Sequence, residues 1–153
     1  YNGIFNYNDL IAFINAYFKK KGYNRKVMDH TEKRKKTHRN ISFRFRPYRM
    51  VKATMLEVQV WLNINNMKDV VKTIDNMKVN LNQGNIDITI DCFIRTSVRG
   101  TFDARPEYIF IKTIFDKFLF KAKGKDTQGM VKNDATELKE ELQSFLNLNK
   151  FLF

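Results

Sequence analysis

The sequence contains one cysteine and two histidines among its 153 residues, and each scarcity excludes a class of protein. Because Cys92 is alone, the chain can form neither an internal disulfide nor a thiolate cage for a metal ion. A free cysteine suits a reducing compartment, so we expect a cytoplasmic protein. His30 and His38 have no ligand pattern and no neighbouring nucleophile, so the sequence predicts no metal site and no histidine catalysis.

Glycine is also sparse, and the six glycines are scattered rather than grouped in a phosphate-binding loop. Asp87 and Asp91 could suggest a magnesium site, but residues four apart on a strand lie roughly 13 Å apart, too far to share one ion. Cross-strand pairing of these carboxylates with arginine is the simpler interpretation. We therefore predict a protein that is not an enzyme and uses no cofactor and no small-molecule substrate.

Long apolar runs are missing as well. The most apolar stretch, Tyr108–Phe120, has 13 residues and includes charged residues at positions 112, 116 and 117. A helix that crosses a membrane needs about 20 apolar residues. The N-terminus has no basic region followed by an apolar run, so neither a membrane span nor a signal peptide is predicted.

Apolar residues nevertheless make up 43% of the chain and aromatic residues 14%, which is enough to form a hydrophobic core. A chain of 153 residues fits one domain that folds without disulfides or metals. We therefore predict a single domain over residues 1–153.

The first predicted element is a helix. Asn6 and the polar residues after it offer capping oxygens, and apolar residues then recur every three or four positions from Leu10 to Phe18. The lysines that follow favour the negative end of the helix dipole, and Gly22 is placed to end the helix in a left-handed conformation.

Strand periodicity follows. Apolar residues alternate with polar ones from Ile41 to Phe45, until Pro47 interrupts the pattern. The segment Arg25–Glu32 could pair with this strand, which would leave Lys33–His38 as the tip of a hairpin.

Further strands are predicted from Leu56 to Ile64 and from Ile86 to Ile94, the latter with Cys92 facing inward. A short hairpin over Val70–Leu81, turning near Asp75, is predicted between them. The run Asn82–Asn85 is typical of a turn.

Two helices are predicted at the end of the chain. The first begins near Pro106, and residues 121–132 are interpreted as a linker because they contain glycines and polar residues. Asp134–Glu137 has capping-box spacing for the last helix. The predicted class is α+β, with an N-terminal helix, an antiparallel sheet of four to six strands and two C-terminal helices on one face.

Three motifs carry a resemblance to known proteins: Tyr7–Leu10 near the start, Lys78–Ile86 in the middle and Ile114–Phe118 late in the chain. They are similar to motifs of a loose group of small, uncharacterised archaeal proteins that open with a Tyr-Asn-Asp-Leu helix. The similarity runs along most of the chain. The group has no assigned activity, so the resemblance implies a cytosolic setting and no mechanism. The basic run Lys33–Lys36 departs from the group.

The net charge of +12 is confined to residues 19–52, which contain 14 Lys or Arg residues against two carboxylates; the rest of the chain has 14 basic and 14 acidic residues. Concentrated like charges repel one another, and a phosphate backbone relieves this repulsion and releases counterions. We therefore predict a non-catalytic nucleic-acid-binding protein, with RNA or the ribosome as its partner. The residues expected to contact phosphate are Lys33, Arg34, Lys35, Lys36, Arg39, Arg44, Arg46 and Arg49. Tyr48 and Trp61 are candidates for stacking on bases.

Other interpretations stay open. The basic segment could be a solvated loop that keeps the protein soluble, or a membrane-surface or targeting signal. A different class of function is a self-assembling or scaffold protein, including one of viral origin, whose homo-oligomers form through the C-terminal helices. The candidate oligomer contacts are Phe110, Phe120, Phe151 and Phe153.

Overall fold

A computed structural model describes the backbone of residues 1–52, 54–74, 77–96 and 121–152. In chain order its elements are β1 (Asn2–Phe5), α1 (Tyr7–Lys20), β2 (Val27–Arg34), β3 (Arg39–Phe45), β4 (Tyr48–Val51), β5 (Thr54–Ile74), β6 (Met77–Thr96) and α3 (Lys121–Leu152). The predicted α+β class and the antiparallel sheet of up to six strands are confirmed. The helix predicted from Pro106 lies outside the described residues, so α3 is the one C-terminal helix in the described part of the chain.

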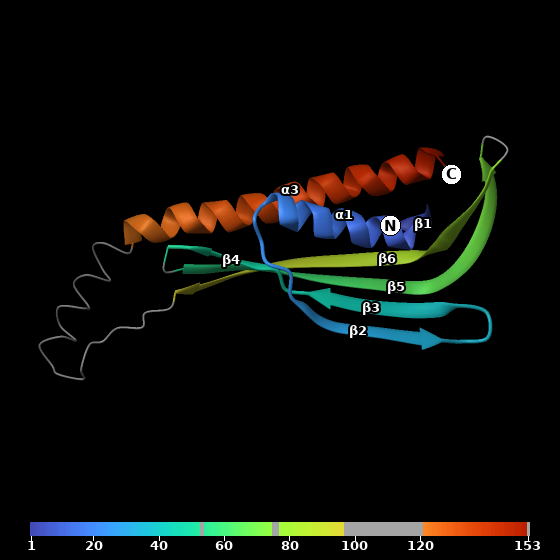
Figure 1. Cartoon of the computed structure of the whole chain (residues 1–153), viewed down its shortest axis with the longest axis horizontal. Coiled ribbons are helices and arrows are strands. Elements are labelled where there is room, and N and C mark those ends of the chain that lie inside the picture. Colours follow the sequence, from blue (N-terminus) through green and yellow to red (C-terminus); the bar gives the residue numbers. More distant parts are fainter. Residues whose placement is uncertain (53, 75–76, 97–120, 153) are drawn as a thin grey trace, which may run out of the picture.

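The sheet is built around one long hairpin. Its strand order is β1-β6-β5-β3-β2, with β4 paired to β5, and every pairing is antiparallel. β5 and β6 are paired from Thr54↔Thr96 to Ile74↔Met77. The predicted turn near Asp75 falls between these strands, outside the described residues. Figure 1 shows α1 and α3 on the same side of the sheet.

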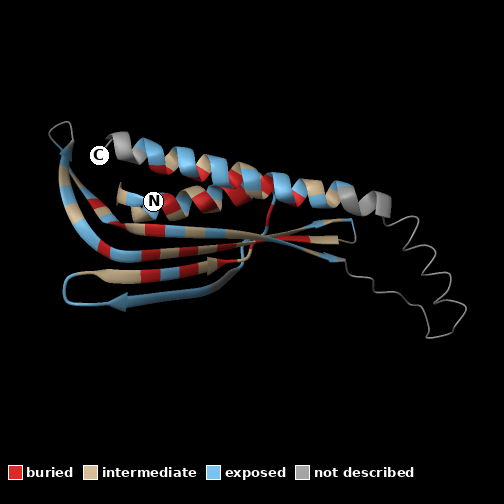
Figure 2. Cartoon of the chain, turned by 180° about the vertical axis from the view of Figure 1, so that it is seen from behind, coloured by how far each residue is buried: buried red, intermediate tan, exposed pale blue. Residues whose placement is uncertain are grey.

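The hydrophobic core lies between the helices and one face of the sheet (Figure 2). The predicted inward face of β5 is confirmed, because alternate residues from Leu56 to Ile64 are fully buried. They pack in one cluster with the apolar stripes of the two helices, which include Leu10 and Ile14 of α1 and Leu138 of α3. Burial of each such side chain stabilises the fold by about 1.5–3 kcal/mol.

Helix α1 begins and ends as its sequence predicts. The Asn6 side-chain oxygen accepts hydrogen bonds from the backbone N–H groups of Asn8, at 3.0 Å, and Asp9, at 3.3 Å. Gly22 has a φ of +73° just beyond the helix end. Glycine adopts this left-handed conformation without strain, so it terminates the helix and redirects the chain toward β2.

The predicted turn at Asn82–Asn85 is wrong, because these residues lie within β6 and pair with β1. The chain therefore opens with a strand, and the predicted N-terminal helix comes second. Gly84 is needed for close approach of the backbones: a Cβ there would lie 3.0 Å from the Asn65 carbonyl oxygen and 3.2 Å from the Met67 Cα. The glycine and asparagines that predicted a turn are instead strand residues, at a point where the backbones of β5 and β6 approach closely.

The predicted linker at residues 121–132 is also wrong, because α3 is continuous from Lys121. A glycine inside a helix costs about 1 kcal/mol, and the packing of Val131, Leu138 and Leu142 in the core offsets this cost. Asp134 is thus not a capping residue but a buried mid-helix residue. None of the helices in the described part of the chain carries an apolar stretch long enough to cross a lipid bilayer.

Candidate nucleic-acid interface

Both described helices lie on one side of the sheet (Figure 1). The opposite face carries the polar residues of β3, β5 and β6, because the apolar residues that alternate with them pack in the core. On β5 these are Gln59, Trp61 and Asn63, which alternate with the buried apolar residues as the sequence predicts. No described helix covers this face. We call it the outer face.

The guanidinium groups of two arginines lie over aromatic rings of the outer face. Arg44 is opposite Trp61 in the β3–β5 register, and its guanidinium carbon lies 4.6 Å from the centroid of the Trp61 ring. The Arg46 guanidinium carbon lies 5.4 Å from the centroid of the Phe93 ring. Stacking of this kind holds the planar guanidinium in place while its N–H edge remains free to bond. The sequence predicted Arg44, Arg46 and Trp61 here.

Phe93 was not among the candidates, although it is 39% exposed on the same face. The signal was available, because Phe93 has the outward register on β6 that Trp61 has on β5. Cys92 faces the helices as predicted, because its Sγ lies 3.7 Å from the Val131 carbonyl oxygen of α3, but the residue is exposed rather than buried.

A buried carboxylate lies among the arginines. Glu57 is only 5% exposed, although it lies among the polar residues of the outer face of β5. Arg46 forms an ion pair with it, and Arg95 Nε lies 3.7 Å from Glu57 Oε2. Tyr48 is opposite Glu57 in the β4–β5 register. Arg46 therefore has two roles, as the partner of Glu57 and as part of the outer face.

The carboxylates Asp87 and Asp91 lie opposite Asn63 and Gln59 on the outer face. Asp87 accepts a weak hydrogen bond from Asn65 Nδ2 at 3.4 Å. The expected pairing with arginine goes to Glu57 instead, because that residue lies nearer to Arg46 and Arg95.

The basic hairpin is formed by β2 and β3, which pair from Val27↔Phe45 to Arg34↔Arg39. The strands extend further than expected, so the tip is residues 35–38, closed by a 2.8 Å hydrogen bond from the Lys35 N–H to the His38 carbonyl. Lys33 is opposite Asn40, in the same outward register as Arg44. Lys33 and the tip lysines are exposed.

A hollow of about 240 Å³ lies where the hairpin tip meets β5. It is lined by the tip residues together with Arg34, Arg39, Lys68 and Asp69. Arg39 is fixed there by a 2.7 Å bond to Asp69 Oδ1, and Arg34 is 2.8 Å from Glu32 Oε1. The hydrogen bond from Arg34 keeps the pKa of the Glu32 carboxyl below its ordinary value. Cations dominate the rim, so the hollow suits a phosphate group. Lys68 was not predicted to contact phosphate, because it lies outside the basic segment of residues 19–52.

Arg49 is not part of this interface, because it lies on the helix side of the sheet. Its Nη2 donates to Asp134 Oδ2 at 2.8 Å and its Nη1 donates to the Lys21 carbonyl at 3.0 Å. Its guanidinium carbon lies 4.8 Å from the Tyr23 ring centroid. The Arg49 guanidinium, predicted to contact phosphate, is thus bound to groups within the fold.

Asp134 is the centre of that network. Tyr23 donates its hydroxyl to Asp134 Oδ2 at 2.9 Å, and Tyr17 donates to the Asp134 carbonyl at 2.6 Å. Burial is the main cause that raises the pKa of both phenols above the ordinary value. The network connects the end of α1, strand β4 and the middle of α3, and we call it the Asp134 cluster.

The candidate oligomer contacts fall outside what the structure describes. Phe110, Phe120 and Phe153 lie outside the described residues, and Phe151 lies in α3 without a described side chain. Oligomer formation through these residues therefore stays a prediction.

No protein family, curated protein or solved structure matches this chain. The resemblance to archaeal proteins stays a prediction, and the function must be inferred from the residues and their geometry.

Proposed function

We propose that the protein binds single-stranded or locally unpaired RNA, without catalysis, through the outer face and the β2–β3 hairpin. The observation that carries the proposal is the stacking of Arg44 on Trp61 and of Arg46 on Phe93, on a face that no described helix covers. The exposed lysines of the hairpin continue this surface at its edge.

Aromatic rings and guanidinium planes both stack on unpaired bases, and each base stacked on an aromatic ring contributes about 1–3 kcal/mol. A duplex hides these base faces, so an open sheet that carries Trp61 and Phe93 favours a single strand. Because RNA presents unpaired loops more often than DNA does, RNA is the favoured partner.

The hairpin would supply the phosphate contacts. Lys33, Lys35 and Lys36 are exposed, and the hollow beside them gathers Arg34, Arg39 and Lys68 around a space of about 240 Å³. Neutralising six phosphates of a single strand gives log K against log[salt] a slope of about −4. Affinity should therefore fall steeply as salt rises.

The test is fluorescence anisotropy of a labelled single-stranded RNA at low salt. The hairpin variant replaces residues 33–36 by serine. Its matched control replaces Lys19, Lys20, Lys132 and Lys139 by serine, which are exposed and lie in the two helices. We expect the hairpin variant to bind at least about tenfold more weakly and the control to change by less than about threefold.

Both variants lose the same formal charge, so a general charge effect would weaken them equally. Equal weakening, or an unchanged affinity of the hairpin variant, would contradict the proposal. Circular dichroism and thermal melts establish that both variants are folded.

A further inference from the structure

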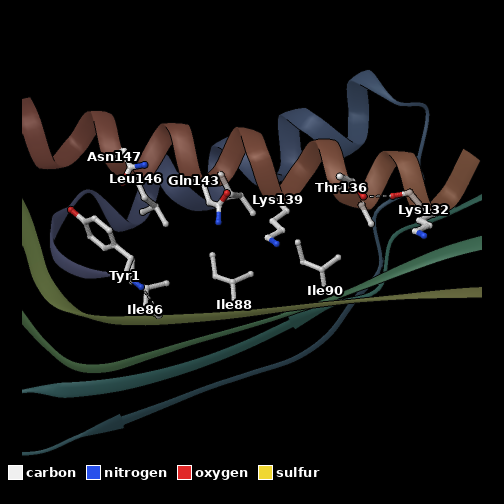
Figure 3. A pocket seen from close by; sticks show the side chains of 12 residues that line it. Tyr1, Ile86, Ile88, Ile90, Lys132, Thr136, Lys139, Gln143, Leu146 and Asn147 are labelled. Atoms are coloured by element: carbon white, nitrogen blue, oxygen red, sulfur yellow. Dashed lines mark hydrogen bonds between the residues drawn. The ribbon is translucent and has the colours of Figure 1, made fainter.

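A groove of about 760 Å³ lies between α3 and β6, on the opposite side of the sheet from the outer face. Figure 3 shows its floor of Ile86, Ile88 and Ile90, with Lys139 reaching over it and Lys132 at one end. Apolar residues of α3, including Leu142 and Leu146, line the other wall. The proposed RNA-binding residues are not part of it.

The floor strand has an open edge beside this groove. β1 pairs with β6 over Asn82–Asn85, and the last contacts are hydrogen bonds between Tyr1 and Ile86, at 2.9 Å and 2.7 Å. Beyond Ile86, no strand of the described chain pairs with β6 on this side.

The direction of the free backbone groups follows from that last pair. Both the N–H and the C=O of Ile86 point to the β1 side, and the direction of these groups alternates along a strand with a period of two. The backbone groups of Ile88, Ile90, Cys92 and Ile94 therefore point to the same open edge. The backbone N–H and C=O groups of Thr89 and Asp91 point instead to β5.

An open edge of this kind is normally blunted by a proline, a lysine or a bulge. The edge-facing positions here carry none of these residues, since they are three isoleucines and a cysteine. β1 shows that the space beside β6 accepts an antiparallel strand next to α3. A strand placed beyond β1 would continue its line, with alternate side chains entering the groove.

The charge of the groove indicates which kind of partner it can bind. The charged side chains that line the groove are Lys132 and Lys139, whereas Glu137 and Glu140 of α3 do not line it. A second copy of this chain would bring two sets of lysines and two net charges of +12 together, which disfavours pairing of β6 with itself.

We propose that this groove binds an extended, acidic segment of a partner protein, which adds as a strand to the edge of β6 along Ile88–Ile94. Main-chain hydrogen bonds supply the affinity, and the side chains at every second position of the segment enter the groove. These groove-facing side chains are apolar where they pack on the isoleucines and carboxylates where they meet Lys132 and Lys139.

The probe is a short capped peptide with threonine at every even position and valine and glutamate in turn at the odd positions, titrated into the full chain and followed by isothermal calorimetry. In the proposed register the odd positions face the groove, and their N–H groups bond to β6. N-methylation of the odd positions should therefore abolish binding, whereas N-methylation of the threonines should leave the affinity within about threefold. Equal binding of the two methylated peptides would overturn the proposal.

The variant K132E/K139E tests the charge. Both lysines are exposed, so the fold should tolerate the change, and we expect at least about tenfold weaker binding of the acidic peptide and tighter binding of a peptide with lysine in place of glutamate. Unchanged selectivity would overturn the proposal. So would the absence of binding at about 1 mM peptide, or a dimer in sedimentation velocity that the peptide does not dissociate.

Amide hydrogen exchange supplies a readout that a merely structural role of the groove would not give. In the free protein the N–H groups of Ile88 and Ile90 should exchange faster than those of Thr89 and Asp91, and the peptide should slow only the first pair. Protection of both pairs without peptide would mean that the edge is already covered, and would overturn the proposal. The serine variant of residues 33–36 should bind the peptide normally, which separates this site from the RNA surface.

Discussion

Arg44 and Arg49 belong to the same basic segment but lie on opposite faces of the sheet. Arg49 donates to Asp134 and to the Lys21 carbonyl and covers the Tyr23 ring, so its charge is used within the fold. Arg44 lies on Trp61 on the outer face. Two arginines that count equally toward the net charge therefore have different roles. The difference shows that strand register, rather than charge, decides which cations can meet a partner.

Contacts on the two faces should also contribute differently to the free energy of unfolding. Removal of one member of a buried ion pair leaves an uncompensated charge and costs about 3–5 kcal/mol. An exposed cation–π contact contributes about 0.5–1 kcal/mol. Substitutions in the Asp134 cluster should thus change stability, and those of Arg44 and Trp61 on the outer face should change binding.

The largest effect is expected from Asp134→Ala. This change removes the acceptor of Tyr23 and Arg49 and leaves the guanidinium without its carboxylate. The free energy of unfolding should fall by about 3 kcal/mol, measured by urea denaturation. Arg44→Ala is the matched control and should cost less than about 1 kcal/mol. Equal losses would remove the distinction between the two faces.

A smaller effect is expected from Tyr23→Phe, which removes a hydrogen bond to a carboxylate and should cost about 1.5–3 kcal/mol near neutral pH. Burial raises the pKa of Tyr23 and Tyr17, so the fold prefers the neutral phenol. Their contribution is therefore fully present below pH about 10, the ordinary pKa, and is lost as pH rises above it.

The loss of stability between pH 9 and 11, about one unit either side of the ordinary pKa, should be shallower in Tyr23→Phe than in the unchanged protein. Urea denaturation at each pH measures this. A variant with the same alkaline slope would show that the Asp134 cluster does not bury this phenol.

On the outer face, Trp61→Ala should weaken RNA binding by about 1–2 kcal/mol, because one base loses its stacking platform. Trp61→Phe retains a ring and should recover most of the affinity. RNA anisotropy at fixed salt measures both. Unfolding free energies should change little in Trp61→Phe. If alanine and phenylalanine weaken binding equally, stacking at this position is not the reason.

The smallest effect is expected from Arg34→Ala. Its partner is Glu32, at 2.8 Å, and the arginine side chain is 75% exposed. Exposed ion pairs contribute about 0–1 kcal/mol, so the urea midpoint should hardly move. RNA affinity should fall measurably in the same variant. The opposite result, a destabilised protein with full RNA affinity, would place Arg34 with Arg49 as a structural residue.

The features that the sequence predicted correctly depend on local signals. The capping oxygen of Asn6, the left-handed Gly22 and the alternation from Leu56 to Ile64 are properties of neighbouring residues, and each matches the structure. The pairing of β2 with β3 was predicted because the two segments are neighbours in the sequence. On the outer face, the register alone placed Trp61 and Arg44 together.

The features that were missed depend on residues distant in the sequence. Gly84 has the local sequence of a turn glycine, but it lies in a strand because β1 pairs beside it. Asp134 has the local sequence of a helix cap, but it lies within a helix, where it binds Arg49 and Tyr23. β4 was missed because Pro47 ends the local pattern, while the pairing with β5 resumes at Tyr48. Tertiary contacts override local preference at each of these positions.

RNA is proposed to lie on the outer face, which carries Trp61, the only tryptophan of the chain. Titration of the protein with a short single-stranded RNA at low salt, followed by tryptophan fluorescence, therefore reports on that face directly. We expect saturable quenching with the same midpoint as RNA anisotropy, and loss of both signals together as salt is raised. Binding seen by anisotropy with unchanged Trp61 fluorescence would contradict it, because the RNA would then lie elsewhere on the protein.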